Sequence, residues 1–211
     1  MTPPPRPRSR RGEGELLRDE ILAAAQNLLL ETASEEAVSI RAVADAVGVT
    51  PPSIYRHFAD KDRLLLEVCR ESFTAFYDHL AEAATDADVV NRMADLGRAY
   101  IRYAVDHPEH YRIMFMSRFD LSAQDYAEEM ITEGNAFELL LATSAELIAE
   151  GRVRPEVAAE GALHVGILFW ASVHGLASLM VAKPGLPWPD RGQLVDQQLL
   201  STLRGLIVED A

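Results

Sequence analysis

Three side chains with hydroxyl, imidazole and ammonium groups follow one another between residues 55 and 61. They are Tyr55, His57 and Lys61, and each can donate a hydrogen bond to a phosphate oxygen. Packing alone gives little reason for a Tyr-x-His-Phe-x-x-Lys run, so we interpret it as a candidate phosphate-binding surface.

Two short helical patterns joined by a tight turn position this run. Ser39 can cap the first helix, Gly48 stands where that helix needs a left-handed residue to end, and Thr50 can cap a second helix over Pro51–His57. The apolar positions of the first helix share one face: Ile40, Val43, Ala44 and Val47. The arrangement predicts a helix-turn-helix motif.

The second helix of such a motif enters the major groove of DNA. A helix over Pro51–His57 would be about 10 Å long, which suits a groove about 12 Å wide. An ordinary helical hairpin is the alternative. The outer face of this helix nevertheless carries Ser53, Tyr55 and Arg56, whereas only Ile54 and Phe58 form a buried stripe.

Residues 50–65, TPPSIYRHFADKDRLL, resemble the signature of TetR-type transcriptional regulators. Ile21, the Ala24–Ala25 pair and Ala44–Gly48 resemble it as well, so the likeness covers roughly residues 15–68. One departure is Thr32-Ala33-Ser34-Glu35, where the family usually has a glycine after its first helix. The resemblance implies a homodimeric, ligand-responsive repressor that binds a palindromic operator.

The expected DNA contacts follow from the motif and the resemblance. Tyr55, His57 and Lys61 are expected to hold phosphates, and Pro52, Ser53 and Arg56 to read bases. The full set is Ser39, Arg41, Thr50, Pro51, Pro52, Ser53, Tyr55, Arg56, His57 and Lys61.

The negative charge of the chain is distributed unevenly. Of the net −13, residues 1–63 contribute −1, with nine Lys and Arg against ten Asp and Glu, and residues 64–211 contribute −12. Because DNA repels an acidic body, only the N-terminal part is expected to contact it. Residues 1–14 read as a disordered, basic, Pro-rich arm, which is either a solvated tail or a further DNA contact.

Helical periodicity predicts an all-α fold of about nine helices. We expect a helix-turn-helix domain over 15–62 and a ligand-binding and dimerisation domain over 63–211, connected by a long helix from Lys61 to about Ala84. The other expected helices are Glu15–Glu31, Val89–Asp106, Pro108–Arg118, Ser122 to about Glu150, Pro155–Val181 and Gly192–Val208.

One uncharged stretch, Gly161–Ala182, is long enough to span a bilayer. It contains two histidines and three glycines, and we expect a buried helix rather than a membrane segment. One face could pack on the body and another on a second subunit. In TetR-type proteins the last two helices pair with their symmetry mates as a four-helix bundle, and the resemblance implies dimer contacts at Ala171, Gly175, Ser178, Leu194, Gln198, Ser201 and Gly205.

A second resemblance concerns the predicted ligand-binding and dimerisation domain, residues 63–211, which we call the body. His107–Phe115, with Trp170, His174 and Gly175, resembles a subset of the family whose regulatory domain bears Trp and His-Gly motifs. Aromatic and Met side chains with few polar ones are typical of a small-molecule cavity, although each could also be plain core. The expected ligand contacts are Tyr103, Tyr111, Met114, Phe115, Phe119, Phe137, Trp170 and His174, with His174 giving the polar contact.

Other functions find little support in the sequence. No H-E-x-x-H, G-x-S-x-G, P-loop or dinucleotide motif occurs, so we expect neither an enzyme nor a metal or cofactor. The single cysteine, Cys69, excludes an internal disulfide, and the first ten residues lack an apolar signal-peptide core, so we expect a cytoplasmic protein. The alternative from another class is a ligand-binding or partner-binding helical module without functional DNA binding.

Overall fold

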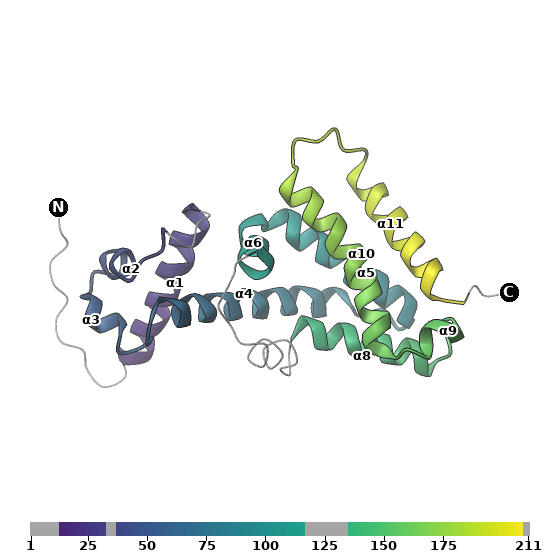
Figure 1. Ribbon diagram of the computed structural model, residues 1–211, viewed down its shortest axis with the longest axis horizontal. Helices are drawn as coiled ribbons and strands as arrows, with labels where there is room; N and C mark the ends of the chain where they lie inside the picture. The colour runs from purple at the N-terminus through teal and green to yellow at the C-terminus, as the bar shows by residue number, and fades with distance from the viewer. Residues whose placement is uncertain (1–12, 33–36, 117–134, 209–211) are drawn as a thin grey trace. The chain divides into compact units, whose positions relative to one another are not determined.

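The computed structural model describes residues 13–32, 37–116 and 135–208 (Figure 1). The chain divides into two compact units, residues 1–72 with 112–120, and residues 73–111 with 121–211. The described residues form ten helices, and one isolated antiparallel bridge joins Val153 to Ile207. The all-α fold is confirmed, with one helix more than the nine expected.

The first unit contains α1 (Glu13–Thr32), α2 (Ile40–Val47) and α3 (Pro51–Ile54). Ser39 Oγ accepts a hydrogen bond from Ala42 N at 3.1 Å, as expected of an N-cap. Gly48 ends α2 with φ 76°, and both its N–H and that of Val49 donate to the Ala44 carbonyl at 2.9 Å. Local chemistry thus sets the turn between α2 and α3.

The helix after this turn is shorter than predicted. α3 ends at Ile54, and Tyr55–His57 form a turn in which His57 N donates to the Ile54 carbonyl. The predicted side-chain cap by Thr50 is also wrong, because its hydroxyl lies 3.2 Å from Ser53 Oγ instead. Pro51 and Pro52 have no N–H, so Ser53 is the first residue of α3 that can donate, and its N–H donates to the Thr50 backbone carbonyl at 2.8 Å.

The long helix α4 (Lys61–Ala83) begins where the sequence indicates. Asp60 Oδ1 accepts from Arg63 N at 2.8 Å and caps it. Its residues as far as Ser72 belong to the first unit, and those from Phe73 onward belong to the second. Within the first unit Arg18 joins α1 to α4 through a 2.6 Å ion pair with Glu67.

The second unit is assembled around α5 (Val89–Asp106), which packs against α8 (Ala136–Ala149), α10 (Ala162–Ala182) and α11 (Arg191–Leu206) (Figure 1). α6 (Pro108–Met116) follows α5, and its first four residues belong to this unit. The apolar face of α5 is buried along its whole length. This helix is therefore the core of the body.

Two predicted long helices are interrupted. The helix expected from Ser122 to Glu150 is wrong, because Asn135 is extended and its side chain caps a new helix by accepting from Phe137 N at 2.8 Å. Ser122 itself lies outside the described residues. The helix expected over Pro155–Val181 is also wrong, because α9 (Pro155–Ala158) ends before Gly161, whose φ of 88° suits glycine.

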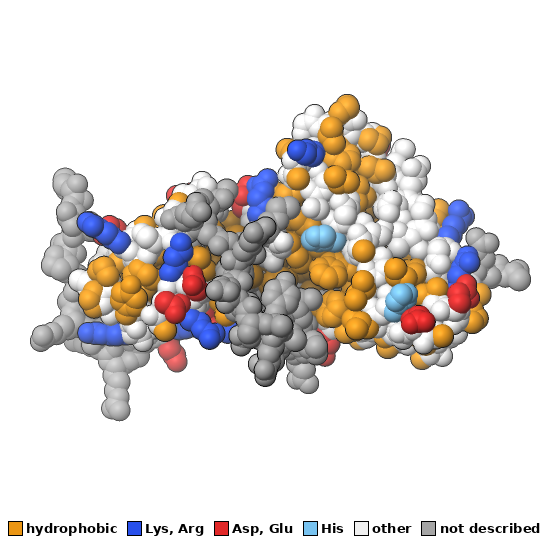
Figure 2. Space-filling model, viewed as in Figure 1, with side chains coloured by type: hydrophobic (Ala, Val, Ile, Leu, Met, Phe, Trp, Pro, Cys, Tyr) orange, Lys and Arg blue, Asp and Glu red, His pale blue; other side chains and the backbone are white. Residues whose placement is uncertain are grey.

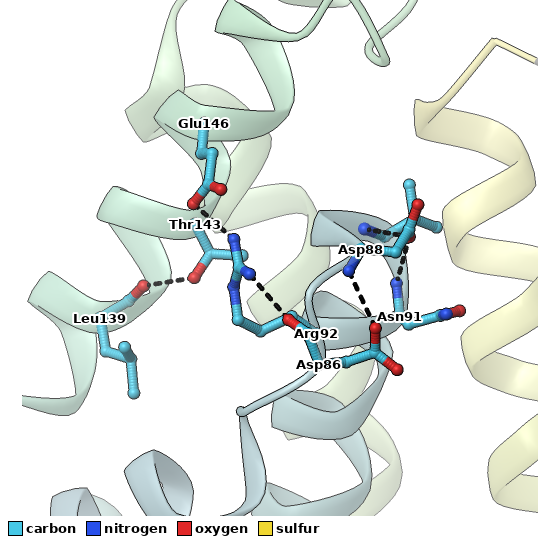
Figure 3. A network of polar contacts seen from close by, with 8 residues as sticks. Asp86, Asp88, Asn91, Arg92, Leu139, Thr143 and Glu146 are labelled. Atoms are coloured by element: carbon cyan, nitrogen blue, oxygen red, sulfur yellow. Dashed lines mark hydrogen bonds and ion pairs between the residues drawn. The ribbon is translucent and has the colours of Figure 1, made fainter.

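A polar network fixes the start of α5 against α8 (Figure 3). Arg92 donates to the Asp86 carbonyl at 2.8 Å and forms a 2.5 Å ion pair with Glu146. Asp88 caps α5, because its Oδ1 accepts from Val90 N at 2.9 Å and from Asn91 N at 3.0 Å. The hydrogen bonds from these amides, helped by Arg152, lower the pKa of Asp88 below 3.8.

This cap predicts an acid-dependent loss of stability. The folded-state pKa of Asp88 lies below its unfolded value, so its contribution is complete above the unfolded pKa and is lost as the pH falls through the folded pKa. Asp88→Asn retains a capping oxygen but no titratable charge. We expect the melting temperatures of wild type and variant to differ most near neutral pH and to converge as the pH falls through the folded pKa of Asp88. A constant difference measured across that range would contradict this prediction.

Candidate functional site

The predicted DNA-contact residues lie around the α2–α3 turn and the start of α4. Tyr55 is 54% exposed, whereas Ile54 and Phe58 are buried, so the segment is anchored on one side and presents polar groups on the other. Ser39, Arg41, Thr50, Pro51, Pro52, Tyr55 and Arg56 are exposed, and Ser53, His57 and Lys61 are half-buried. The predicted set therefore lies at or near the surface of α2, α3, the turn that follows α3 and the first residue of α4.

Phe58 and Arg18 fix the end of this segment. The Arg18 guanidinium lies 5.3 Å from the centre of the Phe58 ring while it pairs with Glu67. We call the predicted DNA-binding domain, residues 15–62, the head. Basic and acidic side chains are interspersed on its described part, as Figure 2 shows. Arg41 and Arg56 are exposed there, but so are Asp45 and Asp60. This part of the surface is therefore not uniformly basic.

A second polar site lies in the body, where α5, α6 and α10 meet. His174 Nδ1 lies 2.8 Å from the Tyr100 hydroxyl and 3.0 Å from the Tyr111 hydroxyl. Trp170 Nε1 donates to the Tyr100 oxygen at 3.3 Å. Phe137 of α8 packs against the Trp170 ring at 5.9 Å between centroids. The site is a hydrogen-bonded aromatic cluster from four helices.

Burial keeps this cluster uncharged. It raises the pKa of Tyr100 far above its ordinary value, raises the pKa of Tyr111 to about 12, and lowers the pKa of His174. A neutral His174 can accept one hydroxyl proton at Nδ1 and carries its own proton on Nε2. Tyr100 is the nearer donor, and Tyr111 can turn to the His174 carbonyl at 3.4 Å. His174 Nδ1 is thus already used within the protein.

The structure brings together only some of the predicted ligand contacts. Tyr111, Phe137, Trp170 and His174 share the cluster, and Tyr103 borders it through Phe76, whose ring contacts both Tyr100 and Tyr103. Met114 and Phe115 belong to the first unit. Phe119 lies outside the described residues. Tyr100 was missed, although its position three residues before Tyr103 on one helical face was a usable signal.

The predicted dimer contacts lie on α10 and α11. Ala171, Gly175, Ser201 and Gly205 are exposed, and Ser178, Leu194 and Gln198 are half-buried. Gln198 donates to Ser172 Oγ at 2.7 Å, and Ser172 lies 2.6 Å from Thr202 Oγ1, so part of this set joins the two helices within one chain. Leu168 and Leu179 of α10 are 42% and 54% exposed.

α10 is long and apolar enough to cross a membrane by length and composition. It contains no charged residue, and Figure 2 shows hydrophobic and uncharged atoms over its visible surface. Its other side is buried against α5, α8 and α11. The core helix of a soluble protein passes the same test, so these features do not indicate a membrane span.

The described part of the chain contains no group of three or more His, Cys, Asp or Glu side chains that could hold a metal ion. His107 and His110 contact each other, with ring centroids 5.8 Å apart, and burial lowers the pKa of His110. Cys69 is buried as a free thiol.

Two family models match the chain. The model for bacterial regulatory proteins of the tetR family matches residues 21–68, and the tetracyclin repressor-like C-terminal domain matches residues 93–202, which is more than half of the chain. A Bacillus subtilis (strain 168) relative, the uncharacterized HTH-type transcriptional regulator YobS, is 22% identical over 117 residues. The alignment covers 52% of this chain and 61% of that relative, less than two thirds of its length.

Solved structures show the same fold. A protein of unknown function from Rhodococcus sp. RHA1 superposes with a TM-score of 0.73 at 23% identity, over 91% of this chain and 95% of that one. The fatty acid degradation regulator FadR from Bacillus halodurans superposes with a TM-score of 0.70 at 18% identity, over 93% and 97%. These two solved structures therefore share the all-α fold of this chain.

Proposed function

Because the chain belongs to the TetR family of bacterial transcriptional regulators, with a DNA-binding and a C-terminal ligand-binding domain, we propose that it is a cytoplasmic, homodimeric repressor released by a small apolar or aromatic effector. The observation that carries the proposal is the α2–α3 turn. Gly48 sets the angle between the helices, and the exposed side of Pro51–His57 carries Tyr55 and Arg56.

Phosphate contacts in the proposal fall to Tyr55, His57 and Lys61, with Ser39 and Arg41 assisting from α2. Pro52, Ser53 and Arg56 read base edges. The nearly neutral charge of residues 1–63 supports a head that binds weakly alone. Two heads on a palindromic operator then supply the affinity.

The dimer is proposed to form through the exposed face of α10 and the adjoining side of α11. Leu168, Leu179 and Leu200 are exposed there beside the small residues Ala171 and Gly175. Exposed apolar side chains of this kind are typical of a subunit interface. Small residues allow the two copies of a helix to approach closely.

Release is proposed to act through α4. This helix begins at Lys61, one of the proposed phosphate contacts, and also carries Phe76, whose ring packs against Tyr100 of the aromatic cluster in the body. An effector bound in the body would favour a state in which α4 is displaced. The two heads would then no longer match the operator spacing.

The second candidate is a helical ligand-binding or partner-binding module that does not bind DNA, and the near-neutral head is the observation that favours it. Lys61→Ala separates the two. For a repressor, this change should weaken binding to all DNA sequences by a similar factor and lower the slope of log K against log salt by about one per subunit.

The matched control is Lys183→Ala, because Lys183 is the other lysine of the chain and follows α10. Filter binding or fluorescence anisotropy at several salt concentrations measures both slopes. We expect the control to keep the wild-type slope. A wild-type protein without salt-dependent binding to the DNA upstream of its own gene would contradict the repressor and favour the module.

A further inference from the structure

Two polar groups in the body, on α4 and α5, have no hydrogen-bond partner within the described structure. His79 Nε2 is buried and unpartnered. Tyr103 is only 5% exposed as a residue, and its hydroxyl makes no hydrogen bond among the described residues, but the oxygen itself is not fully buried. The two rings lie 5.4 Å apart between centroids, so the groups are neighbours.

A buried nitrogen without a partner, such as His79 Nε2, is unusual, because leaving a buried donor or acceptor unsatisfied destabilises a fold. Burial alone raises the pKa of Tyr103, which agrees with a hydroxyl that has no bonded neighbour. The Tyr100, Tyr111 and Trp170 groups are in contrast all used around His174. Within the described residues, His79 Nε2 and the Tyr103 hydroxyl therefore remain able to bond to another molecule.

The surroundings of the pair are aromatic. The Phe76 ring lies 5.0 Å from the Tyr103 ring between centroids, and the ring of His107, the residue that follows α5, lies 4.8 Å from it. A phenol hydroxyl and an imidazole N–H are both donors, so together they can hold one acceptor oxygen beside flat apolar rings. A carbonyl group on an aromatic or apolar molecule has this chemistry.

We propose that His79 and Tyr103 form the polar end of the effector site and bind an acceptor oxygen of an otherwise apolar molecule. This assignment rests on the proposed function and replaces His174 as the polar contact, since the tyrosines already occupy His174 Nδ1. His174 instead positions the aromatic cluster.

Stability measurements test the pair without any ligand. His79→Phe keeps a ring against Tyr103 and removes the unpartnered nitrogen, so the melting temperature should stay the same or rise. Tyr103→Phe should behave likewise. Tyr100→Phe, which removes a bonded hydroxyl, should lower it. A fall for His79→Phe as large as that for Tyr100→Phe would overturn the proposal, because it would mean that the nitrogen is satisfied in the free protein.

Binding is tested with acetophenone, which has one acceptor oxygen, and ethylbenzene, which has none. Ligand-observed NMR gives the ratio of the two affinities. In the His79→Phe, Tyr103→Phe double variant this ratio should fall at least fivefold in favour of ethylbenzene, because two hydrogen bonds are lost. Tyr77→Phe, which removes a half-buried hydroxyl elsewhere on α4, should leave the ratio unchanged.

An unchanged ratio in the double variant, or no binding of acetophenone to the wild type, would overturn the proposal. Operator binding by the same variants is measured in parallel. Intact operator binding with an unchanged ratio rejects the effector site alone, whereas the absence of operator binding in the wild type rejects the proposed function.

Discussion

Ala171→Glu is expected to convert the proposed dimer into a folded monomer. Ala171 lies on the exposed apolar side of α10, and in a two-fold symmetric interface each copy would bring a carboxylate into the contact. Burying an unpaired charge is strongly unfavourable. Operator affinity should then fall roughly 10²–10⁴-fold, because the second head no longer benefits from the first.

Sedimentation velocity measures the oligomeric state, and circular dichroism checks that the monomer is helical. The matched control is Ala145→Glu, the same substitution at an exposed position of α8. We expect this control to remain dimeric and to bind the operator as the wild type does. An Ala171→Glu protein that remains a dimer would show that the subunits associate through another surface.

Gly97→Val is expected to destabilise the body more than any other single glycine replacement in α5, α10 or α11. A Cβ at Gly97 would lie 2.4 Å from Leu199 Cδ2 and 2.9 Å from Phe169 Cζ. Both neighbours are almost fully buried and cannot move into solvent. Overpacking of this kind costs about 3 kcal/mol, or roughly 6–12 °C in melting temperature.

Thermal unfolding followed by circular dichroism measures this loss. Gly14→Val is the control, because Gly14 lies in α1 and a Cβ there meets nothing within 4 Å. The control should change stability by less than about 0.5 kcal/mol, as surface substitutions usually do. Equal melting temperatures for Gly97→Val and the wild type would mean that α5, α10 and α11 do not pack as closely as described.

The head could be predicted from sequence because its geometry depends on neighbouring residues. Ser39, Gly48 and Asp60 act on backbone groups no more than four positions away. Each therefore leaves a signal that a short window contains. The errors at Pro51–His57 were likewise local: the Thr50 side chain does not cap the helix, and the last turn tightens through the i+3 bond from His57 N to the Ile54 carbonyl.

The body was predicted less well, because its boundaries and site depend on residues far apart in the chain. Asn135 and Gly161 interrupt apolar patterns that continue on both sides. Hydrophobic periodicity therefore predicted one continuous helix at each place, where the described chain begins a new helix. The hydrogen bond between Tyr100 and His174 joins residues 74 positions apart. Which tyrosine meets the histidine follows from how α5 packs on α10, and composition carries no information about that packing.

Selection of bound sequences from random double-stranded DNA tests the central claim most directly. A dimer that reads DNA with Pro51–His57 should enrich a palindrome whose half-site centres lie about 34–36 Å apart, one turn of the double helix, or a multiple of that distance. Lys61→Ala should enrich the same palindrome with lower yield. Enrichment of a single half-site, or of no sequence at all, would contradict a dimeric DNA-binding regulator.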